Sequence, residues 1–126
     1  AQYDFACTQL NGTKVGTLDG ETENFMPLYV PEKIDFPRRA LGSGDRFNDS
    51  PADHKLLTEL GCDIREMEGA AIAQVCKYAS VPFVCVKSIS DVYGSGSTTE
   101  QFKKNLKLAN LVLRAHMQEI IGGIDA

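Results

Sequence analysis

Three short polar segments carry the residue types best suited to bind a ligand or perform catalysis. They are Ser43-Gly44-Asp45-Arg46-Phe47-Asn48, Glu66-Met67-Glu68 and Lys87-Ser88-Ile89-Ser90-Asp91. In open α/β sheets, ligands bind beyond the carboxyl ends of the strands, and two of these segments directly follow predicted strands. A buried strand has no packing reason to end in Lys, Ser and Asp. The three segments are therefore the candidates for a ligand-binding or catalytic site.

A structural interpretation competes at each segment. Ser90 and Asp91 belong to residue types that favour turns. Glu66 and Glu68 precede a very apolar helix, where acids complement the helix dipole and contribute only ~0.3–1 kcal/mol. The Gly-Ser-Gly turn at 42–44 is a common sequence, and the GxxxxGK[ST] phosphate loop is absent. Residue type and spacing leave both interpretations open.

Strands and helices are predicted to alternate around these segments. The predicted strands are Tyr3–Leu10 and Lys14–Leu18 in a hairpin about Asn11-Gly12, then Arg38–Ser43 and Pro82–Ser90. Three prolines make residues 20–37 a predicted loop. The helix start and stop signals are Ser50-Pro51 and Gly61 for the first helix, Met67 and Ala79 for the second, and a Thr98/Gln101 capping box and Gly122-Gly123 for the third. This alternation predicts an α/β layered fold with a sheet covered by helices.

Composition narrows the class of protein. Hydrophobic residues make up 43% and charged residues 24% of the 126 residues, as in an ordinary globular domain. A net charge of −4 without a dense basic cluster argues against nucleic-acid binding. No apolar run approaches the ~20 residues of a membrane span, and Ala1-Gln2-Tyr3-Asp4 has neither the basic nor the apolar region of a signal peptide, so we do not expect secretion. The four cysteines form no CxxC pair and no zinc spacing, so we expect a reducing, cytoplasmic location and no metal.

Two runs of sequence bear a family resemblance. Residues Arg65–Ala73 (REMEGAAIA) and Val81–Asp91 (VPFVCVKSISD) closely resemble the methylthioadenosine/adenosylhomocysteine nucleosidases, whose pattern is an E-M-E-[AG]-x-A helix start, a V-P-[FV] strand and an S-D end. Upstream, Leu41–Phe47 (LGSGDRF) resembles the family's S-G-D-x-F segment. The resemblance spans roughly residues 36–121. These enzymes are relatives of the nucleoside phosphorylases.

The resemblance implies a role for each acidic segment. Glu68 would bind the ribose hydroxyls and stabilise the oxocarbenium-like sugar that forms as the glycosidic bond breaks. Met67 would pack against the sugar, and Glu66 would support the same wall of the site. Asp91 would be the general acid that protonates purine N7, for which it must hold its proton at neutral pH. Ser90 would hold Asp91 or the base edge in place.

The resemblance also implies residues that bind the base, and it includes one position where this chain departs from the family pattern. Phe47 would stack on the purine, and main-chain groups around Asn48 would read the base edge. Lys87 is a departure, because many bacterial nucleosidases carry Arg there, and Lys keeps the charge without the bidentate fork.

The fold implied is a three-layer nucleoside-phosphorylase-like sandwich with a central mixed sheet. This chain, residues 1–126, would supply about half of it, as a partial domain. The absent N-terminal half would carry the Glu that activates water in the nucleosidases. We therefore expect association with that half, with a second copy in a homodimer, or with both, and no cofactor.

Three functions are compatible with these residues. The first is hydrolysis of 5′-methylthioadenosine or S-adenosylhomocysteine to release adenine, in purine and methionine salvage. The second is phosphorolysis by a purine nucleoside phosphorylase that uses the same Glu and Asp. The third is non-catalytic binding or storage of a small-molecule purine nucleoside on the same fold.

Overall fold

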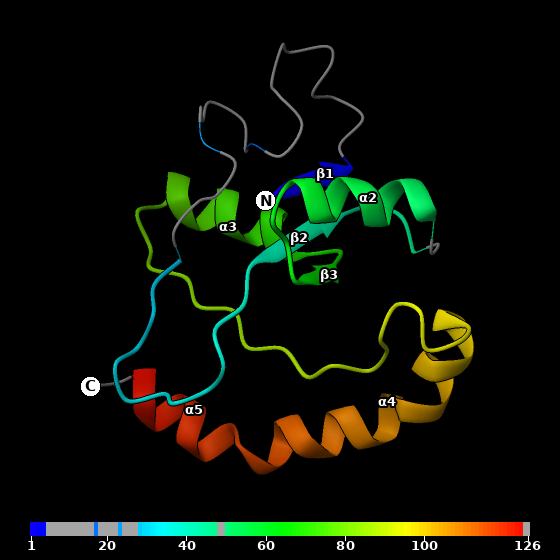
Figure 1. The fold of residues 1–126 in the computed structure, drawn as a ribbon. Helices are drawn as coiled ribbons and strands as arrows, with labels where there is room; N and C mark the ends of the chain where they lie inside the picture. Colours follow the sequence, from blue (N-terminus) through cyan, green and yellow to red (C-terminus); the bar gives the residue numbers. More distant parts are fainter. Residues whose placement is uncertain (5–16, 18–22, 24–27, 48–49, 125–126) are drawn as a thin grey trace. The chain divides into compact units, whose positions relative to one another are not determined.

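The computed structural model describes residues 1–4, 17, 23, 28–47 and 50–124 (Figure 1). It confirms an α/β fold with a small parallel sheet and four helices among the described residues. The chain divides into two compact units. The first comprises Ala1–Tyr29 and Pro37–Phe83, and the second comprises Val30–Phe36 and Val84–Ala126. No described helix is long and apolar enough to cross a membrane.

The sheet belongs to the first unit. Its strands are β1 (Gln2–Asp4), β2 (Leu41–Gly44) and β3 (Ile64–Glu66), hydrogen-bonded in the order β1-β2-β3 and all parallel. Strand β2 confirms the core of the strand predicted over 38–43, although it begins at Leu41 and extends to Gly44. The predicted hairpin lies largely outside the described residues, since of its two strands only Tyr3, Asp4 and Thr17 are described.

The sequence analysis missed strand β3. Three residues are too few to show the alternation that identifies a strand, and polar Arg65 and Glu66 make up most of it. Pairing with β2 places Leu41 opposite Ile64, Gly42 opposite Arg65 and Ser43 opposite Glu66. Because successive residues of a strand point to opposite faces, this register puts Ser43 and Glu66 on one face and Gly42 and Arg65 on the other.

Each face of the sheet meets a different helix of the first unit. A Cβ on Gly42 would collide with the side chain of Leu57, a buried residue of α2 (Pro51–Glu59). On the other face, a Cβ on Gly69, the first residue of α3 (Gly69–Tyr78), would lie 2.9 Å from Leu41 Cδ2. Glycine at these two positions therefore allows each helix to approach the sheet closely.

The predicted ends of α2 are confirmed. Ser50 caps the helix by accepting a hydrogen bond from Asp53 N at 3.0 Å, and Pro51 occupies the first turn. At the other end, Gly61 has a φ of +71°. The amides of Gly61 and Cys62 donate to the carbonyls of Thr58 and Leu57, which is the Schellman pattern.

Helix α3 is shorter than the predicted Met67–Ala79. Glu68 is its N-cap residue and Ala79 its C-cap residue. The same Schellman pattern follows, with Ser80 N donating to Lys77 O and Val81 N to Cys76 O. Ser80 fills the left-handed position with a φ of +56°, where glycine is usual.

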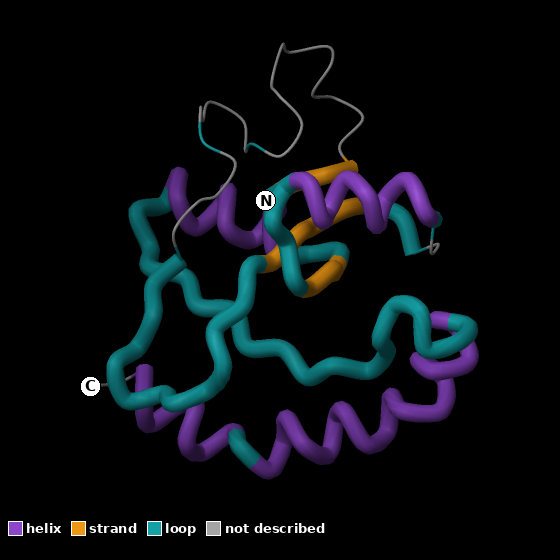
Figure 2. Tube along the Cα trace, viewed as in Figure 1, coloured by secondary structure: helices purple, strands orange, loops and turns teal. Residues whose placement is uncertain are grey.

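The strand predicted over Pro82–Ser90 is wrong. Those residues are all described, and none belongs to a helix or strand (Figure 2). The run has the composition of a buried strand, but a strand requires a ladder of hydrogen bonds to a neighbour. Ile89 is 54% exposed, so the apolar pattern is not matched by burial.

The last predicted helix is two helices in the second unit, α4 (Thr98–Ala115) and α5 (Met117–Ile124). The N-cap residue of α4 is Ser97, whose Oγ accepts from Glu100 N at 3.4 Å, so the predicted Thr98/Gln101 cap is wrong by one residue. His116 separates the two helices. Its amide donates to Leu113 O, three residues back, instead of continuing the α-helical ladder.

Gly122-Gly123 does not end the helix. Both residues lie within α5, and Gly123 is buried against Ile34, because a Cβ on Gly123 would lie 2.5 Å from Ile34 Cγ1. This glycine serves close packing instead of chain reversal. Among the described residues of the second unit, the buried apolar side chains include Ile34, Ala109 and Ile120.

Candidate functional site

Ser43 links the end of β2 to the start of α3. Its side chain is buried, with the residue only 4% exposed. The hydroxyl donates to the Glu66 carboxylate and accepts from Ala70 N at 2.8 Å. One hydroxyl therefore joins two strands and a helix, and it does so through the face that Ser43 and Glu66 share.

Glu66 caps α3 from outside the helix. Its carboxylate accepts from Glu68 N at 2.9 Å and from Gly69 N at 2.8 and 2.9 Å. These are the amides that the first turn of a helix leaves without an intrahelical partner. The carboxylate also lies at the positive end of the helix dipole. Glu66 therefore has the structural role considered for it in the sequence analysis, which is to stabilise the start of α3.

Glu68 is placed differently, although it lies only two positions further along the chain. It is the N-cap residue of α3, yet its side chain makes no capping hydrogen bond. Glu68 and Met67 are both exposed, Met67 by 38%. Because Glu66 serves the helix start, the carboxylate of Glu68 is not needed there.

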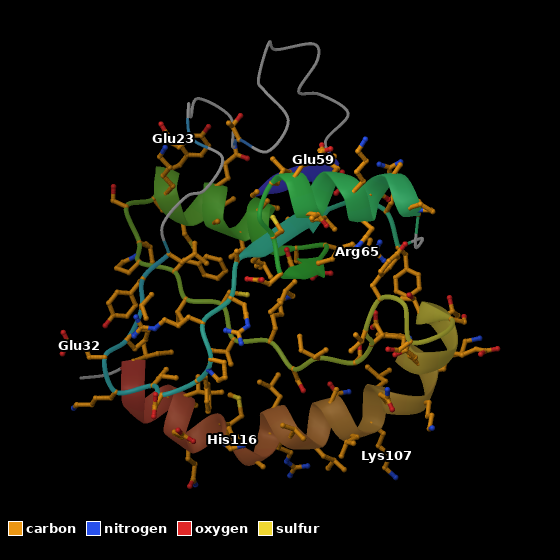
Figure 3. All side chains as sticks on the ribbon, in the orientation of Figure 1. Glu23, Glu32, Glu59, Arg65, Lys107 and His116 are labelled. Atoms are coloured by element: carbon orange, nitrogen blue, oxygen red, sulfur yellow. The ribbon has the colours of Figure 1, made fainter. Side chains whose placement is uncertain are left out.

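The segment between β2 and α2 carries Phe47. Phe47 is 45% exposed. Its main-chain carbonyl accepts a hydrogen bond from Arg65 Nη2 at 3.1 Å. Arg65 belongs to β3 and is labelled in Figure 3. Asn48, the other predicted base-reading residue, lies outside the described residues.

The second unit contains Lys87, Ser90 and Asp91. Lys87 is exposed, and Asp91 is partly buried. Ser90 Oγ donates to Asp91 Oδ2 at 2.6 Å, so the two predicted site residues are in direct contact. The structure brings Ser90 to Asp91 in this unit and Glu66 to Ser43 in the other.

Two amide side chains of α4 hold the segment around Asp91. Asn105 Nδ2 donates to Ser90 O at 2.8 Å. Gln101 accepts from Val92 N and donates to Val92 O, both at 3.1 Å. Gln101 thus binds the main chain after Asp91 and does not serve the predicted helix cap.

The comparisons with known proteins decide the family. A family model described as the phosphorylase superfamily matches residues 25–122. The chain belongs to this superfamily. No solved structure matches the chain.

Curated proteins named as nucleosidases are similar to this superfamily chain. A 5′-methylthioadenosine/S-adenosylhomocysteine nucleosidase of Arabidopsis thaliana is 32% identical over 86 residues, which cover 68% of this chain and 34% of the relative. A protein of the same name from Psychromonas ingrahamii is 38% identical over 88 residues, covering 66% and 36%. The predicted resemblance is confirmed. The chain spans about a third of the length of these relatives.

Sequence reasoning missed several residues that support the predicted site of this superfamily chain. Ser43 accepts a hydrogen bond from the amide of Ala70, and Arg65 donates to the carbonyl of Phe47. Asn105 and Gln101 bond the main chain on either side of Asp91. Ser43 lies within the S-G-D-x-F segment and Arg65 at the start of the REMEGAAIA run, but neither pattern predicted these contacts. The contacts of Arg65, Gln101 and Asn105 join residues 9 to 18 positions apart, and they depend on how the chain folds.

Other features of the described residues do not form a second chemical centre. No group of three or more described His, Cys, Asp or Glu side chains could hold a metal ion. Burial raises the pKa of the Cys62 thiol, which favours the unreactive protonated form. A hollow of about 450 Å³ on α4 includes none of the predicted site residues, being lined by Lys103, Leu106, Lys107, Asn110, Leu111 and Arg114.

Proposed function

We propose that the protein carrying this chain hydrolyses the N-glycosidic bond of 5′-methylthioadenosine or S-adenosylhomocysteine and releases adenine. The observation that carries the proposal is the division of roles between two acids. Glu66 binds the first amides of α3, and Glu68, an exposed residue at the same helix start, makes no capping hydrogen bond with its side chain. The names of the matched relatives support the same reaction.

Glu68 is the sugar-binding acid in this proposal. As the glycosidic bond breaks, positive charge develops on the ribose ring, and a carboxylate bonded to the 2′-hydroxyl stabilises that charge. Met67, also exposed, packs against the sugar. Glu66 supports this wall by fixing the main chain of Glu68, whose amide it accepts at 2.9 Å.

Asp91 is the general acid in this proposal. It donates a proton to purine N7, so that the base leaves as a neutral molecule. The 2.6 Å contact with Ser90 restricts rotation of the carboxyl group, and Asn105 anchors the main chain of Ser90. Phe47 stacks on the purine and main-chain groups around Asn48 read its edge. Lys87 contributes positive charge to nucleoside binding.

The chain is a partial domain in this proposal. The remainder of the protein completes a three-layer sandwich with a central mixed sheet and supplies the Glu that activates water as a general base. Helices α2 and α3, which meet opposite faces of the small sheet, support that architecture. The functional protein is a cytoplasmic homodimer that acts in purine and methionine salvage.

Phosphorolysis is the second candidate, because the matching family model describes the phosphorylase superfamily. The deciding experiment measures adenine release from methylthioadenosine by chromatography, with the protein that carries this chain, in phosphate-free buffer and again with phosphate. Release without phosphate supports hydrolysis, and release only with phosphate replaces it by phosphorolysis. Adenine binding without release in either buffer contradicts both and leaves a nucleoside-binding protein.

A further inference from the structure

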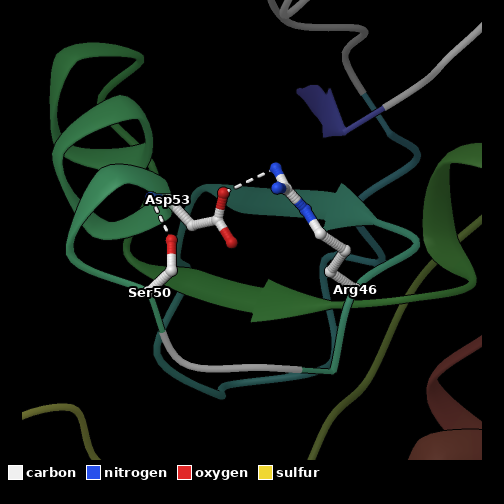
Figure 4. Close-up of polar contacts among 3 residues, drawn as sticks. All are labelled: Arg46, Ser50 and Asp53. Carbon is white, nitrogen blue, oxygen red and sulfur yellow. Dashed lines mark hydrogen bonds and ion pairs between the residues drawn. The ribbon is translucent and has the colours of Figure 1, made fainter.

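The segment that carries Phe47 is anchored to the first turn of α2. Arg46 Nη2 lies 2.7 Å from Asp53 Oδ1 (Figure 4). The two partners differ sharply in burial, since the side chain of Arg46 is 55% exposed and that of Asp53 only 3%. The residue before Phe47 is therefore tied to a group that is itself enclosed by the protein.

Asp53 is held firmly as well as buried. Its amide donates to Ser50 Oγ at 3.0 Å, which fixes its main chain at the helix start. Among the described residues, its Oδ2 has no hydrogen-bond partner. A buried carboxylate is costly unless an opposite charge and hydrogen bonds compensate it, so the Arg46 guanidinium is the essential partner of this one.

A second guanidinium holds Phe47 itself. Arg65 Nη2 donates to Phe47 O at 3.1 Å. Arg65 lies opposite Gly42 in the β2–β3 register and shares its face of the sheet, which is the face that Leu57 of α2 contacts. The main chain around Phe47 is thus restrained from α2 and from β3, while the residue itself stays 45% exposed.

We infer that Asp53 is a positioning residue for ligand recognition, which acts through Arg46 to hold Phe47 as a fixed aromatic platform for a purine base. The inference rests on the proposed function for the identity of the ligand. Restraint of the platform before the ligand arrives reduces the ordering cost of binding, and this raises affinity without any new contact. Arg65 is the second support of the same platform.

The first arm of the test needs no ligand. These 126 residues contain no tryptophan, so F47W places a tryptophan reporter at the proposed platform, and the fluorescence of the protein without F47W is subtracted as background. In the protein carrying this chain, D53N in the F47W background should raise acrylamide quenching and lower fluorescence anisotropy. The matched control is E59Q, which removes an exposed ion pair with Lys55 on the same helix and should change neither signal. Equal quenching in D53N and E59Q would overturn the inference.

The second arm titrates adenine by calorimetry on the natural Phe47 background. D53N should weaken adenine binding roughly tenfold, the scale of one lost charge-assisted hydrogen bond. The effect should disappear in F47A, because Asp53 acts through Phe47 and the two changes are then not additive. An undiminished effect in F47A would contradict the inference.

Misfolding of D53N and failure of the proposed function can each be recognised separately. If D53N fails to fold, R46Q removes the same ion pair from its exposed side and takes its place in both arms. If adenine binds to no variant and not to the unmodified protein, the proposed function fails. In that case the quenching comparison alone supports or overturns the role of Asp53.

Discussion

Acidic residues with candidate roles are held differently in the two units. In the first, Glu66 accepts main-chain amides and the buried Ser43 hydroxyl, while Glu68 two positions away makes no capping bond. In the second, Asp91 contacts the Ser90 hydroxyl, and side chains of α4 hold the neighbouring main chain. The comparison teaches that an acid that organises the fold, such as Glu66, is identified by the main-chain amides it accepts and not by its residue type.

The largest expected effect comes from the acid of the second unit. D91N should lower kcat for adenine release by roughly 10²–10⁴-fold, because it removes the proton donor. The transition temperature should change little, since Asn keeps the shape of the side chain. Stopped or coupled adenine assays alongside thermal unfolding would measure both, with D35N, an exposed acid of the same unit, as control. Undiminished turnover would rule out Asp91 as the general acid.

The next effect concerns Glu68. E68Q should cost about 3–4 kcal/mol of transition-state stabilisation, as for other lost electrostatic contacts to developing charge. Because the residue is exposed and does not cap α3, stability should stay within about 0.5 kcal/mol. Steady-state kinetics and denaturant unfolding would check the two quantities. Unchanged kcat/KM would remove the sugar-binding role.

Glu66 should show the opposite pattern. E66A should lower the free energy of unfolding by about 2–3 kcal/mol, because the amides of Glu68 and Gly69 and the Ser43 hydroxyl lose a charged acceptor. Urea unfolding would measure the loss, with E59Q as the control, because Glu59 is an exposed acid on α2. If stability were unchanged while the KM for nucleoside rose, Glu66 would be a direct ligand of the sugar and the contrast with Glu68 would be lost.

The smallest effect tests the side-chain support in the second unit. N105A should cost about 1 kcal/mol of stability, the net value of one hydrogen bond to the Ser90 carbonyl. It should also lower kcat modestly, because Asp91 is less well held. N110A, an exposed asparagine of the same helix, is the control. Equal behaviour of the two variants would show that Asn105 supports nothing at Asp91.

Local signals in the sequence predicted part of this fold well. Ser50, Pro51 and Gly61 mark the ends of α2, because capping and left-handed turns depend on neighbouring residues alone. The strand predicted at 82–90 is wrong because apolar composition does not specify a pairing partner. Gly123 was misassigned for a related reason, since its contact with Ile34 joins distant parts of the chain.

The candidate site could be predicted as a set of residues but not as an arrangement. The E-M-E and S-D patterns named the acids, and the family resemblance assigned the sugar to Glu68, but neither predicted how Glu66 is held. The contact of Glu66 with Ser43 depends on the β2–β3 register. The support from Arg65, Gln101 and Asn105 likewise depends on tertiary structure and has no local signature.

The Ser43–Glu66 contact has a consequence for the order of folding. A slip of one residue between β2 and β3 would put Ser43 and Glu66 on opposite faces and take the Ser43 hydroxyl away from Glu66 and from the amide of Ala70. Correct strand alignment and a completed helix start are therefore one cooperative event. The amides of Gly69 and Ala70 should exchange with solvent deuterium at the rate of the β2–β3 ladder, far more slowly than the open start of an ordinary helix.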